Sequence, residues 1–299
     1  MAQPAVDGIR CFDHAVLPVV DLWRAERFYT EVLDGAIFQK VGMSYRQPPA
    51  GNGAADLFVD HPGAFVKMGR SHVGLFLQTQ VPVQPPADLE RGFPCLGLAI
   101  ADGAFTDVVQ RVRAAGVAVG QEGLRSLGRL QCRAVRCVDS EGNCLDLVAT
   151  VAADAGSHQV LGLSYLGAET CDLATTGAFY GDVLGLDIAV EGPGWLAVTM
   201  PSGQALVFHQ VQTLSPSMVG PYFGRHFAFY VDDDSFHAIV GRLRAAGIPE
   251  GDALGRNVPG EYATYFYDPN GLWLQVLNHD SARATRGRVL MRYTPVGVA

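Results

Sequence analysis

The sequence predicts an α+β fold of four βαβββ modules, which pair into two domains that each curl a mixed sheet around a cavity. The main support is a hairpin at residues 265–277, where the turn Asp-Pro-Asn-Gly at 268–271 separates a β-prone aromatic run from an apolar run. A weaker copy of this hairpin occupies residues 135–147 and turns at Asp139. Because each hairpin closes about half of the chain, the pair indicates an internal duplication.

Two helix patterns repeat in the same two halves. The Phe-Tyr pair that ends at Tyr180 follows the Phe-Tyr pair that ends at Tyr29 by 151 residues. The helix end Arg-Ala-Ala-Gly at 244–247 follows the same four residues at 113–116 by 131 residues. The offset falls by 20 between these anchors, so the first half carries an insertion, most simply the Pro/Gly/Ala-rich loop 48–64.

The other elements follow from local signals. Asp21 is placed to cap a helix, and Asp172 has the same position in the second half. The predicted strands and helices outside the hairpins are strand 12–20, helix 22–33, strand 71–78, strand 95–101, helix 105–115 and strand 161–168. A small, polar stretch at 151–159 reads as a linker between domains. The predicted divisions are domain 1–150, domain 160–280 and a C-terminal tail at 281–299.

Composition limits the class of protein. The chain has 299 residues, 48% of them hydrophobic and 17% charged, which suits two ordinary domains with apolar cores. The net charge is −8 and no basic cluster occurs, which argues against nucleic acid as a partner. No apolar run is long enough to cross a bilayer, and residues 1–10 lack the apolar core of a secretory signal. The six cysteines form no CxxC pair, so we expect free thiols in a reducing cytoplasm.

The order of strand, Phe-Tyr helix, Arg-Ala-Ala-Gly helix end and Asp-Pro-x-Gly hairpin resembles the vicinal oxygen chelate superfamily. This superfamily includes glyoxalase I, fosfomycin and bleomycin resistance proteins, and type I extradiol dioxygenases. The resemblance covers roughly residues 12–278, and two domains in one chain is the dioxygenase layout. Metal-binding members use a His early on the first strand, a His opening the next module, and a Glu seven residues after the hairpin Asp. These ligands leave open positions on a divalent ion, which a substrate with two neighbouring oxygens can chelate.

Carried onto the second half of the chain, the resemblance places Tyr165 at the first His, His226 at the second His and Gln275 at the Glu. Only one of the three ligands is kept, so ordinary catechol cleavage is not expected from this degenerate triad. The three residues are instead predicted catalytic groups, which orient substrate oxygens or move a proton. Asn257 stands where ring-cleavage enzymes carry an acid–base His after Gly-Arg.

Carried onto the first half, the same positions fall on His14, Cys95 and Asp146. An imidazole, a thiolate and a carboxylate are able to hold iron, manganese or zinc, so these three residues are the predicted metal site. Each also has a simpler interpretation. His14 can be a strand histidine bonded to backbone, Cys95 a core thiol, and Asp146 a solvated surface residue.

Aromatic residues flank the second-half positions. Trp273 shares a strand face with Gln275, and Tyr230 shares one with His226, which suggests a pocket for a planar ligand. An aromatic core explains the same pattern equally well. The predicted substrate-binding residues are Trp273, Tyr230, Asn257 and Tyr267.

Two functions are compatible with these residues. The first is a dioxygenase-like or lyase/isomerase-like enzyme that acts on a small oxygenated, aromatic molecule. Its divalent metal is held either at His14, Cys95 and Asp146 or around His226 with atypical partners, and a cofactor-free enzyme is the remaining alternative. The second is a metal-free protein that sequesters such a molecule, as resistance-type members of the superfamily do. A small molecule is the expected partner in both cases, and a homo-oligomer is compatible with either.

Overall fold

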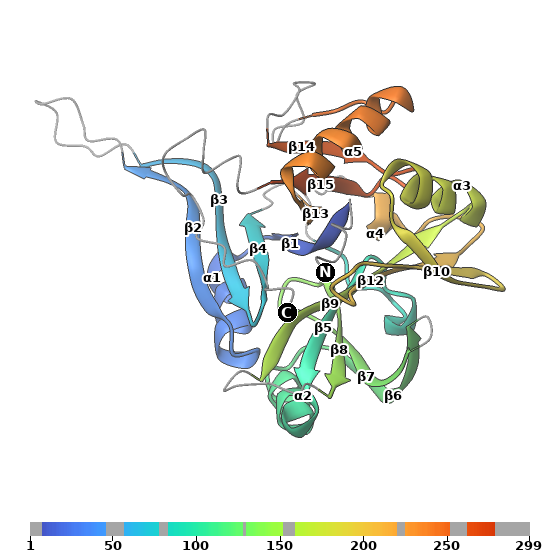
Figure 1. The fold of residues 1–299 in the computed structure, drawn as a ribbon. Helices are drawn as coiled ribbons and strands as arrows, with labels where there is room; N and C mark the ends of the chain where they lie inside the picture. Colours follow the sequence, from blue (N-terminus) through green and yellow to red (C-terminus); the bar gives the residue numbers. More distant parts are fainter. Residues whose placement is uncertain are drawn as a thin grey trace, which may run out of the picture.

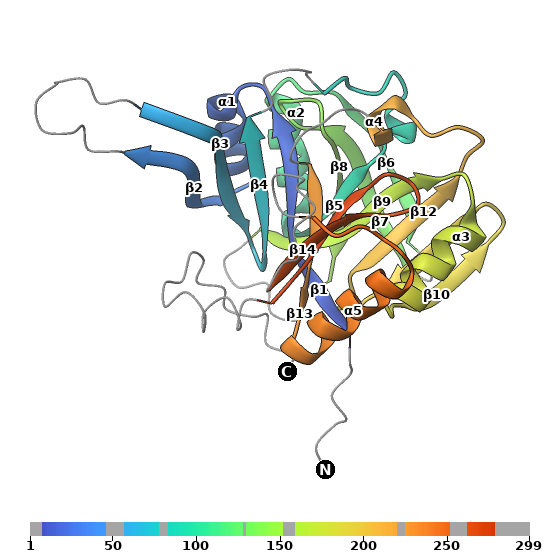
Figure 2. The ribbon, with the colours of Figure 1, turned by 90° about the horizontal axis from the view of Figure 1, so that it is seen from above.

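Two mixed sheets with helices packed against them form the molecule (Figure 1; Figure 2). The computed structural model describes residues 8–45, 57–77, 83–127, 130–151, 159–219, 225–251 and 262–278. Neither sheet closes on itself. This architecture confirms the predicted α+β class of paired modules.

Sheet A has seven strands in the order β14-β15-β13-β1-β4-β3-β2. The two central strands, β1 and β13, pair antiparallel, while β4 and β15 add parallel to them on either side. In Figure 1 the blue first strand therefore lies beside the orange β13. The strands of sheet A are β1 (Ile9–Val19), β2 (Ala36–Tyr45), β3 (Leu57–Met68), β4 (Ser71–Leu77), β13 (His226–Val231), β14 (Ala263–Tyr267) and β15 (Trp273–Leu277).

Sheet B has eight strands in the order β10-β11-β12-β9-β5-β8-β7-β6. Its central strands, β5 and β9, are antiparallel, and β8 and β12 add parallel to them, which repeats the plan of sheet A. The strands of sheet B are β5 (Cys95–Ala101), β6 (Val119–Leu127), β7 (Leu130–Val138), β8 (Cys144–Thr150), β9 (Val160–Thr170), β10 (Asp187–Gly192), β11 (Trp195–Thr199) and β12 (Ala205–Gln210).

Each sheet takes one module from each half of the chain. Sheet A combines the first module with the fourth, and sheet B combines the second with the third. The domain limits 1–150 and 160–280 imply that consecutive modules share a sheet, and the strand pairing differs from that expectation. Contacts other than strand pairing do join the two modules of each half. The domain limits therefore remain a prediction about which residues fold as a unit.

These contacts run from the hairpin of the later module to the first helix of the earlier one. The hydroxyl of Tyr29 donates to Oδ2 of Asp139 at 3.0 Å, and the hydroxyl of Tyr180 donates to Oδ2 of Asp268 at the same distance. Both tyrosines are fully buried. The recurrence of Phe-Tyr and of the turn aspartate in the two halves therefore has a shared structural role.

The helices pack against the sheets, with α1 on β3 and β4, α2 on β5 and β8, and α3 on β11. The predicted caps form, since Asp21 accepts from the backbone N–H of Arg24 and Asp172 accepts from those at the start of α3. None of the described helices is both long and apolar enough to span a membrane. The helices are α1 (Leu22–Arg27) with the π-helical turn Phe28–Val32, α2 (Phe105–Ala114), α3 (Leu173–Ala178) with the π-helical turn Phe179–Val183, α4 (Pro216–Val219), α5 (Asp233–Ala245) and the 3₁₀ turns Leu89–Arg91 and Asp102–Ala104.

Candidate functional site

Polar side chains form a row across the centre of sheet A. His14 on β1 is in register with Ala228 on β13, and Ala228 is in register with Gln275 on β15. His226 stands two residues before Ala228 and therefore lies on the same face of the sheet. This face carries two imidazoles and one amide, drawn from both halves of the chain.

The two histidines meet through their Nε2 atoms. Nε2 of His14 lies 3.1 Å from Nε2 of His226, and the residues are only 3% and 7% exposed. Two nitrogens that bind one ion at about 2.0–2.1 Å lie about 3 Å apart when they occupy adjacent coordination positions. The separation therefore suits a shared ion, and without one it is a hydrogen bond in which one Nε2–H donates to the other nitrogen.

Gln275 adds an amide oxygen to this face. The residue is 5% exposed, and its buried Oε1 has no hydrogen-bond partner among the described residues. A buried acceptor without a donor costs free energy unless a ligand or an ion satisfies it. An amide oxygen is also an accepted, though neutral, ligand for a divalent cation.

A carboxylate lies on the other side of the His14 ring. Oδ2 of Asp13 is 2.6 Å from Nδ1 of His14, and both side chains are buried. A change of register between Phe12 and His14 leaves Asp13 outside the pairing of β1 with β13. Such a bulge lets two consecutive side chains come together, which a regular strand keeps on opposite faces.

Aromatic rings border His226 on the edge of sheet A. The ring centroids of Tyr265 and Trp273 lie 5.2 and 5.6 Å from that of His226. Tyr267 stacks on Trp273 at 6.2 Å with an interplanar angle of 16° and is 62% exposed. This edge therefore offers aromatic surfaces that lead from solvent to the buried imidazole.

Sheet B has residues of another kind at the equivalent positions. Tyr165 on β9 is in register with Gly97 on β5, and Gly97 is in register with Asp146 on β8, which repeats the path across sheet A. The hydroxyl of Tyr165 donates to Oδ2 of Asp146. The ring of Tyr165 packs in a small apolar cluster of Ala134, Val148, Tyr165, Ala197 and Val207.

Arg136 completes the sheet B network. Its Nε and Nη2 donate to the two oxygens of Asp146 at 2.9 and 2.8 Å, and its Nη1 donates to the carbonyl oxygen of Glu90 at 2.9 Å. Burial acts to raise the pKa of Asp146, but the hydrogen bonds and charge of Arg136 outweigh it and hold the pKa below its usual value. Burial, aided by the charge of Asp146, raises the pKa of the Cys95 thiol well above its usual value. In sheet B the carboxylate is thus paired with a guanidinium, and burial disfavours the thiolate form of Cys95.

Comparison with known families agrees with this architecture. Residues 162–276 match the family model described as the Glyoxalase/Bleomycin resistance protein/Dioxygenase superfamily. This match lies in the second half of the chain, modules three and four, and includes the strands that carry Tyr165, His226 and Gln275. Among curated protein sequences, none matches the chain.

Solved structures share the fold of this chain over most of its length. A Bacillus subtilis protein provisionally named a dioxygenase has a TM-score of 0.63 at 13% identity, over 91% of this chain and 86% of its own. Glyoxalase I from Zea mays has a TM-score of 0.62 at 16% identity, over 93% of this chain and 96% of its own. At these identities the similarity establishes the fold and leaves the reaction open.

The sheet order differs from the predicted grouping of site residues. His14 was grouped with Cys95 and Asp146, but His14 lies in sheet A while the other two lie in sheet B. Tyr165 was grouped with His226 and Gln275, but it also lies in sheet B. The physical reason is that β1 pairs with β13, whereas the grouping assumed that the modules of one half share a site. His14 and His226 are the residues that come into contact, and Gln275 shares their face of sheet A.

The predicted substrate-binding residues divide in the same way. Trp273 and Tyr267 line the edge of sheet A beside His226, and Tyr230 lies on β13 two residues after Ala228. Asn257 lies outside the described residues. Whether any of them binds a substrate stays a prediction.

The sequence interpretation missed two residues of sheet A. His72 on β4 is in register with His14 and is buried, and Asp13 contacts the His14 ring. His72 could have been found by pairing the first and last strands of the first module in parallel, which places it beside His14. Even with these residues, no three or more His, Cys, Asp or Glu side chains in the described part of the chain lie close enough to hold a metal ion. The buried Oε1 of Gln275 is a further oxygen on this face that has no partner among the described residues.

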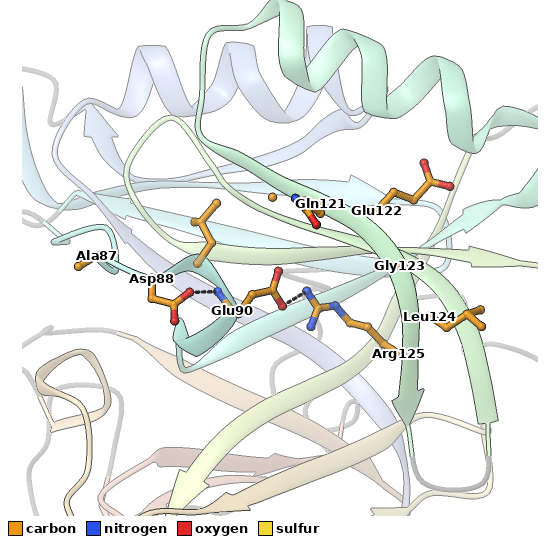
Figure 3. A pocket seen from close by; sticks show the side chains of 10 residues that line it. Ala87, Asp88, Glu90, Gln121, Glu122, Gly123, Leu124 and Arg125 are labelled. Atoms are coloured by element: carbon orange, nitrogen blue, oxygen red, sulfur yellow. Dashed lines mark hydrogen bonds and ion pairs between the residues drawn. The ribbon is translucent and has the colours of Figure 1, made fainter.

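A surface cavity of about 620 Å³ lies beside the sheet B network, between the turn 87–90 and strand β6 (Figure 3), and one of its lining residues, Arg125, places Nε 3.7 Å from Oδ1 of Asp146. Oε2 of Glu90 accepts from Nη2 of Arg125 at 2.7 Å across it, and Asp88 accepts from the backbone N–H of Glu90. None of the predicted site residues lines this cavity.

Proposed function

We propose that the His14, His226 and Gln275 face of sheet A is the active site of a dioxygenase-like enzyme, which acts on a small oxygenated, aromatic molecule. The observation that carries the proposal is the approach of His14 Nε2 to His226 Nε2 at 3.1 Å, from residues 212 positions apart in the sequence. The second half of the chain by itself keeps one ligand of the family pattern, His226. Sheet A, which combines both halves, keeps both histidines of the pattern, and only its carboxylate is replaced, by Gln275.

A divalent metal fits this donor set as two imidazole nitrogens and the buried Oε1 of Gln275, which lacks a described partner. When bound, such an ion supplies Lewis acidity toward two neighbouring substrate oxygens. The protein's own residues then bind and orient the substrate. Tyr265 and Trp273 present ring faces to a planar molecule, and burial of the histidines keeps bulk water from the reacting groups.

A second function, metal-free sequestration of an aromatic compound, is favoured by one observation. A neutral amide replaces the carboxylate, so the face carries less negative charge toward a dication than a site with two imidazoles and a carboxylate. The aromatic edge around Trp273 and Tyr267 is unaffected by this replacement, and it suits stacking of a ligand without any ion.

Metal analysis of protein purified without chelators separates the two functions. We expect stoichiometric iron, manganese or zinc that is lost in His14→Ala and in His226→Ala. The matched control is His209→Ala, because His209 is an exposed histidine on β12 of sheet B. Retention of the metal in His14→Ala contradicts the proposed site. A metal-free protein that binds catechol-type aromatics in a Trp273-dependent way supports sequestration instead.

We further propose that the two sheets arose by duplication and that the sheet B site lost its ligands. The equivalent registers of His14 and Tyr165, and of Gln275 and Asp146, support this history. All six cysteines are free, which fits the proposed reducing cytoplasm.

A further inference from the structure

We infer that Asp13 is a positioning residue, which fixes the tautomer of His14 and provides, behind the imidazole, the negative charge that Gln275 does not provide. The inference rests on the proposed function of the sheet A face. It concerns a residue that the family pattern of two histidines and a glutamate does not include. Its basis is a bulge in β1, a short contact and a comparison with sheet B.

The bulge is what gives Asp13 access to His14. In β1, Phe12 pairs with Phe229 and His14 pairs with Ala228, so Asp13 is the extra residue between two successive pairs. Consecutive strand residues normally point to opposite faces. Because the bulge interrupts that alternation, Oδ2 of Asp13 reaches to 2.6 Å from Nδ1 of His14.

The contact determines which ring nitrogen carries the proton. An ionised carboxylate only accepts hydrogen bonds, so the Nδ1 atom of His14 must be the one that donates. In the neutral ring Nε2 is then left with its lone pair, and Nε2 is the atom that faces His226. A histidine held by a carboxylate in this way is oriented for metal binding and is a more basic ligand.

Burial shields the contact between Asp13 and His14 from water. The side chain of Asp13 is 2% exposed and that of His14 is 4% exposed, so water does not compete for the bond. The low local dielectric strengthens the interaction between a buried charge and its hydrogen-bond donor. Two neutral imidazoles and an amide carry no net charge, and Asp13 gives the group the single negative charge that a glutamate would have supplied.

Sheet B offers an internal comparison. Its equivalent strand, β9, has the same change of register, with Leu163 paired to Leu98 and Tyr165 paired to Gly97. The residue left between the pairs is Ser164. In sheet A the bulge residue is therefore an acid, Asp13, and it precedes an imidazole. In sheet B the bulge residue is Ser164, and it precedes Tyr165, whose phenol ring has no nitrogen for an acid to orient.

The first test is ¹⁵N NMR of the histidine rings in the metal-free protein, with the His14 signals assigned from a His14→Gln sample. We expect Nδ1–H and a bare Nε2 for His14 in the wild type, a mixed or Nε2–H form in Asp13→Ala, and no change in Ser164→Ala. Ser164→Ala is the matched control because it empties the same bulge in the other sheet. A wild-type His14 with its proton on Nε2 overturns the inference without any variant.

The second test is titration with Co(II) as the only added metal. We expect Asp13→Ala and Asp13→Asn to bind Co(II) about 10- to 100-fold more weakly than the wild type, while Ser164→Ala binds normally. Adding Gln275→Glu to Asp13→Asn returns the charge from the other side and restores most of the loss. Wild-type affinity in Asp13→Asn, or no recovery in the double variant, contradicts the charge argument. Failure of the wild type to bind any Co(II) refutes the proposed function, while the NMR result still decides the role of Asp13.

Discussion

Gly97→Ala is a direct perturbation of the sheet B network, because it adds one methyl group beneath the Tyr165 ring. A Cβ built on Gly97 would overlap Cδ1 and Cε1 of Tyr165. The ring is almost fully buried and its hydroxyl donates to Asp146, so it has no free direction in which to move. Accommodating the methyl group therefore requires the ring to leave its position and give up the hydrogen bond.

The cost follows from the two interactions that are lost. A buried hydrogen bond to a charged group contributes about 1.5–3 kcal/mol, and forcing extra volume into a packed site costs about 1–3 kcal/mol. We expect Gly97→Ala to lower the free energy of unfolding by about 3–5 kcal/mol, which is a large part of the roughly 5–15 kcal/mol of a typical domain. Urea unfolding followed by circular dichroism measures the difference.

Two further variants control the experiment. Gly241→Ala in α5 adds the same methyl group where nothing lies within 4 Å, so it is expected to stabilise the protein by about 0.5–1 kcal/mol. Tyr165→Phe removes the hydroxyl alone, and in that background Gly97→Ala should cost less than in the wild type because the hydrogen bond is already absent. Wild-type stability of Gly97→Ala, within about 1 kcal/mol, would refute the packing argument.

Three other outcomes follow from the site geometry. Asp146→Asn leaves the buried guanidinium of Arg136 without its counter-charge, and we expect it to lower the free energy of unfolding in urea by about 3–5 kcal/mol. Adding Arg136→Met to Asp146→Asn should recover part of this loss. An equal loss in the double variant contradicts the pairing of the two side chains. Burial raises the pKa of Asp139 and Asp268 to about 6, above the unfolded value of about 3.9, so the stability these groups contribute is full below about pH 4 and is lost as pH rises through 6. Asp139→Asn should therefore gain stability relative to the wild type between about pH 4.5 and about pH 7, and a pH-independent difference in urea unfolding argues against the shift. Metal analysis should find about one ion per chain and not two, since Arg136 neutralises the carboxylate of sheet B; a second ion that is lost in Asp146→Asn would contradict this.

Much of the fold could be predicted because its signals are local. The turn aspartates, the Phe-Tyr pairs and the capping residues Asp21 and Asp172 are recognisable from a few neighbouring residues each. The offsets between the halves also matched His14 with Tyr165, and Gln275 with Asp146, as positions of the same kind. Strand registers in the two sheets agree with these correspondences.

The partners within each site could not be predicted from the same signals. His14 and His226 are 212 residues apart, and whether β1 pairs with β13 or with β5 depends on how whole modules pack. Module pairing is a tertiary choice that leaves no short pattern in the sequence. The contact of Asp13 with His14 was hidden for a different reason, since strand alternation predicts opposite faces and only the bulge brings the two side chains together.

The two sites differ by one methyl group on the central strand, Gly97 in sheet B and Ala228 in sheet A. Gly97 lets the Tyr165 ring lie across β5, so that its hydroxyl reaches Asp146 and fills the face. Ala228 holds the same register in sheet A, so a Cβ stands on β13 where β5 has none. His14 instead contacts His226, and the amide oxygen of Gln275 is left without a described donor. Sheet B is thus closed by its own side chains, whereas sheet A keeps a buried acceptor that has no donor among the described residues.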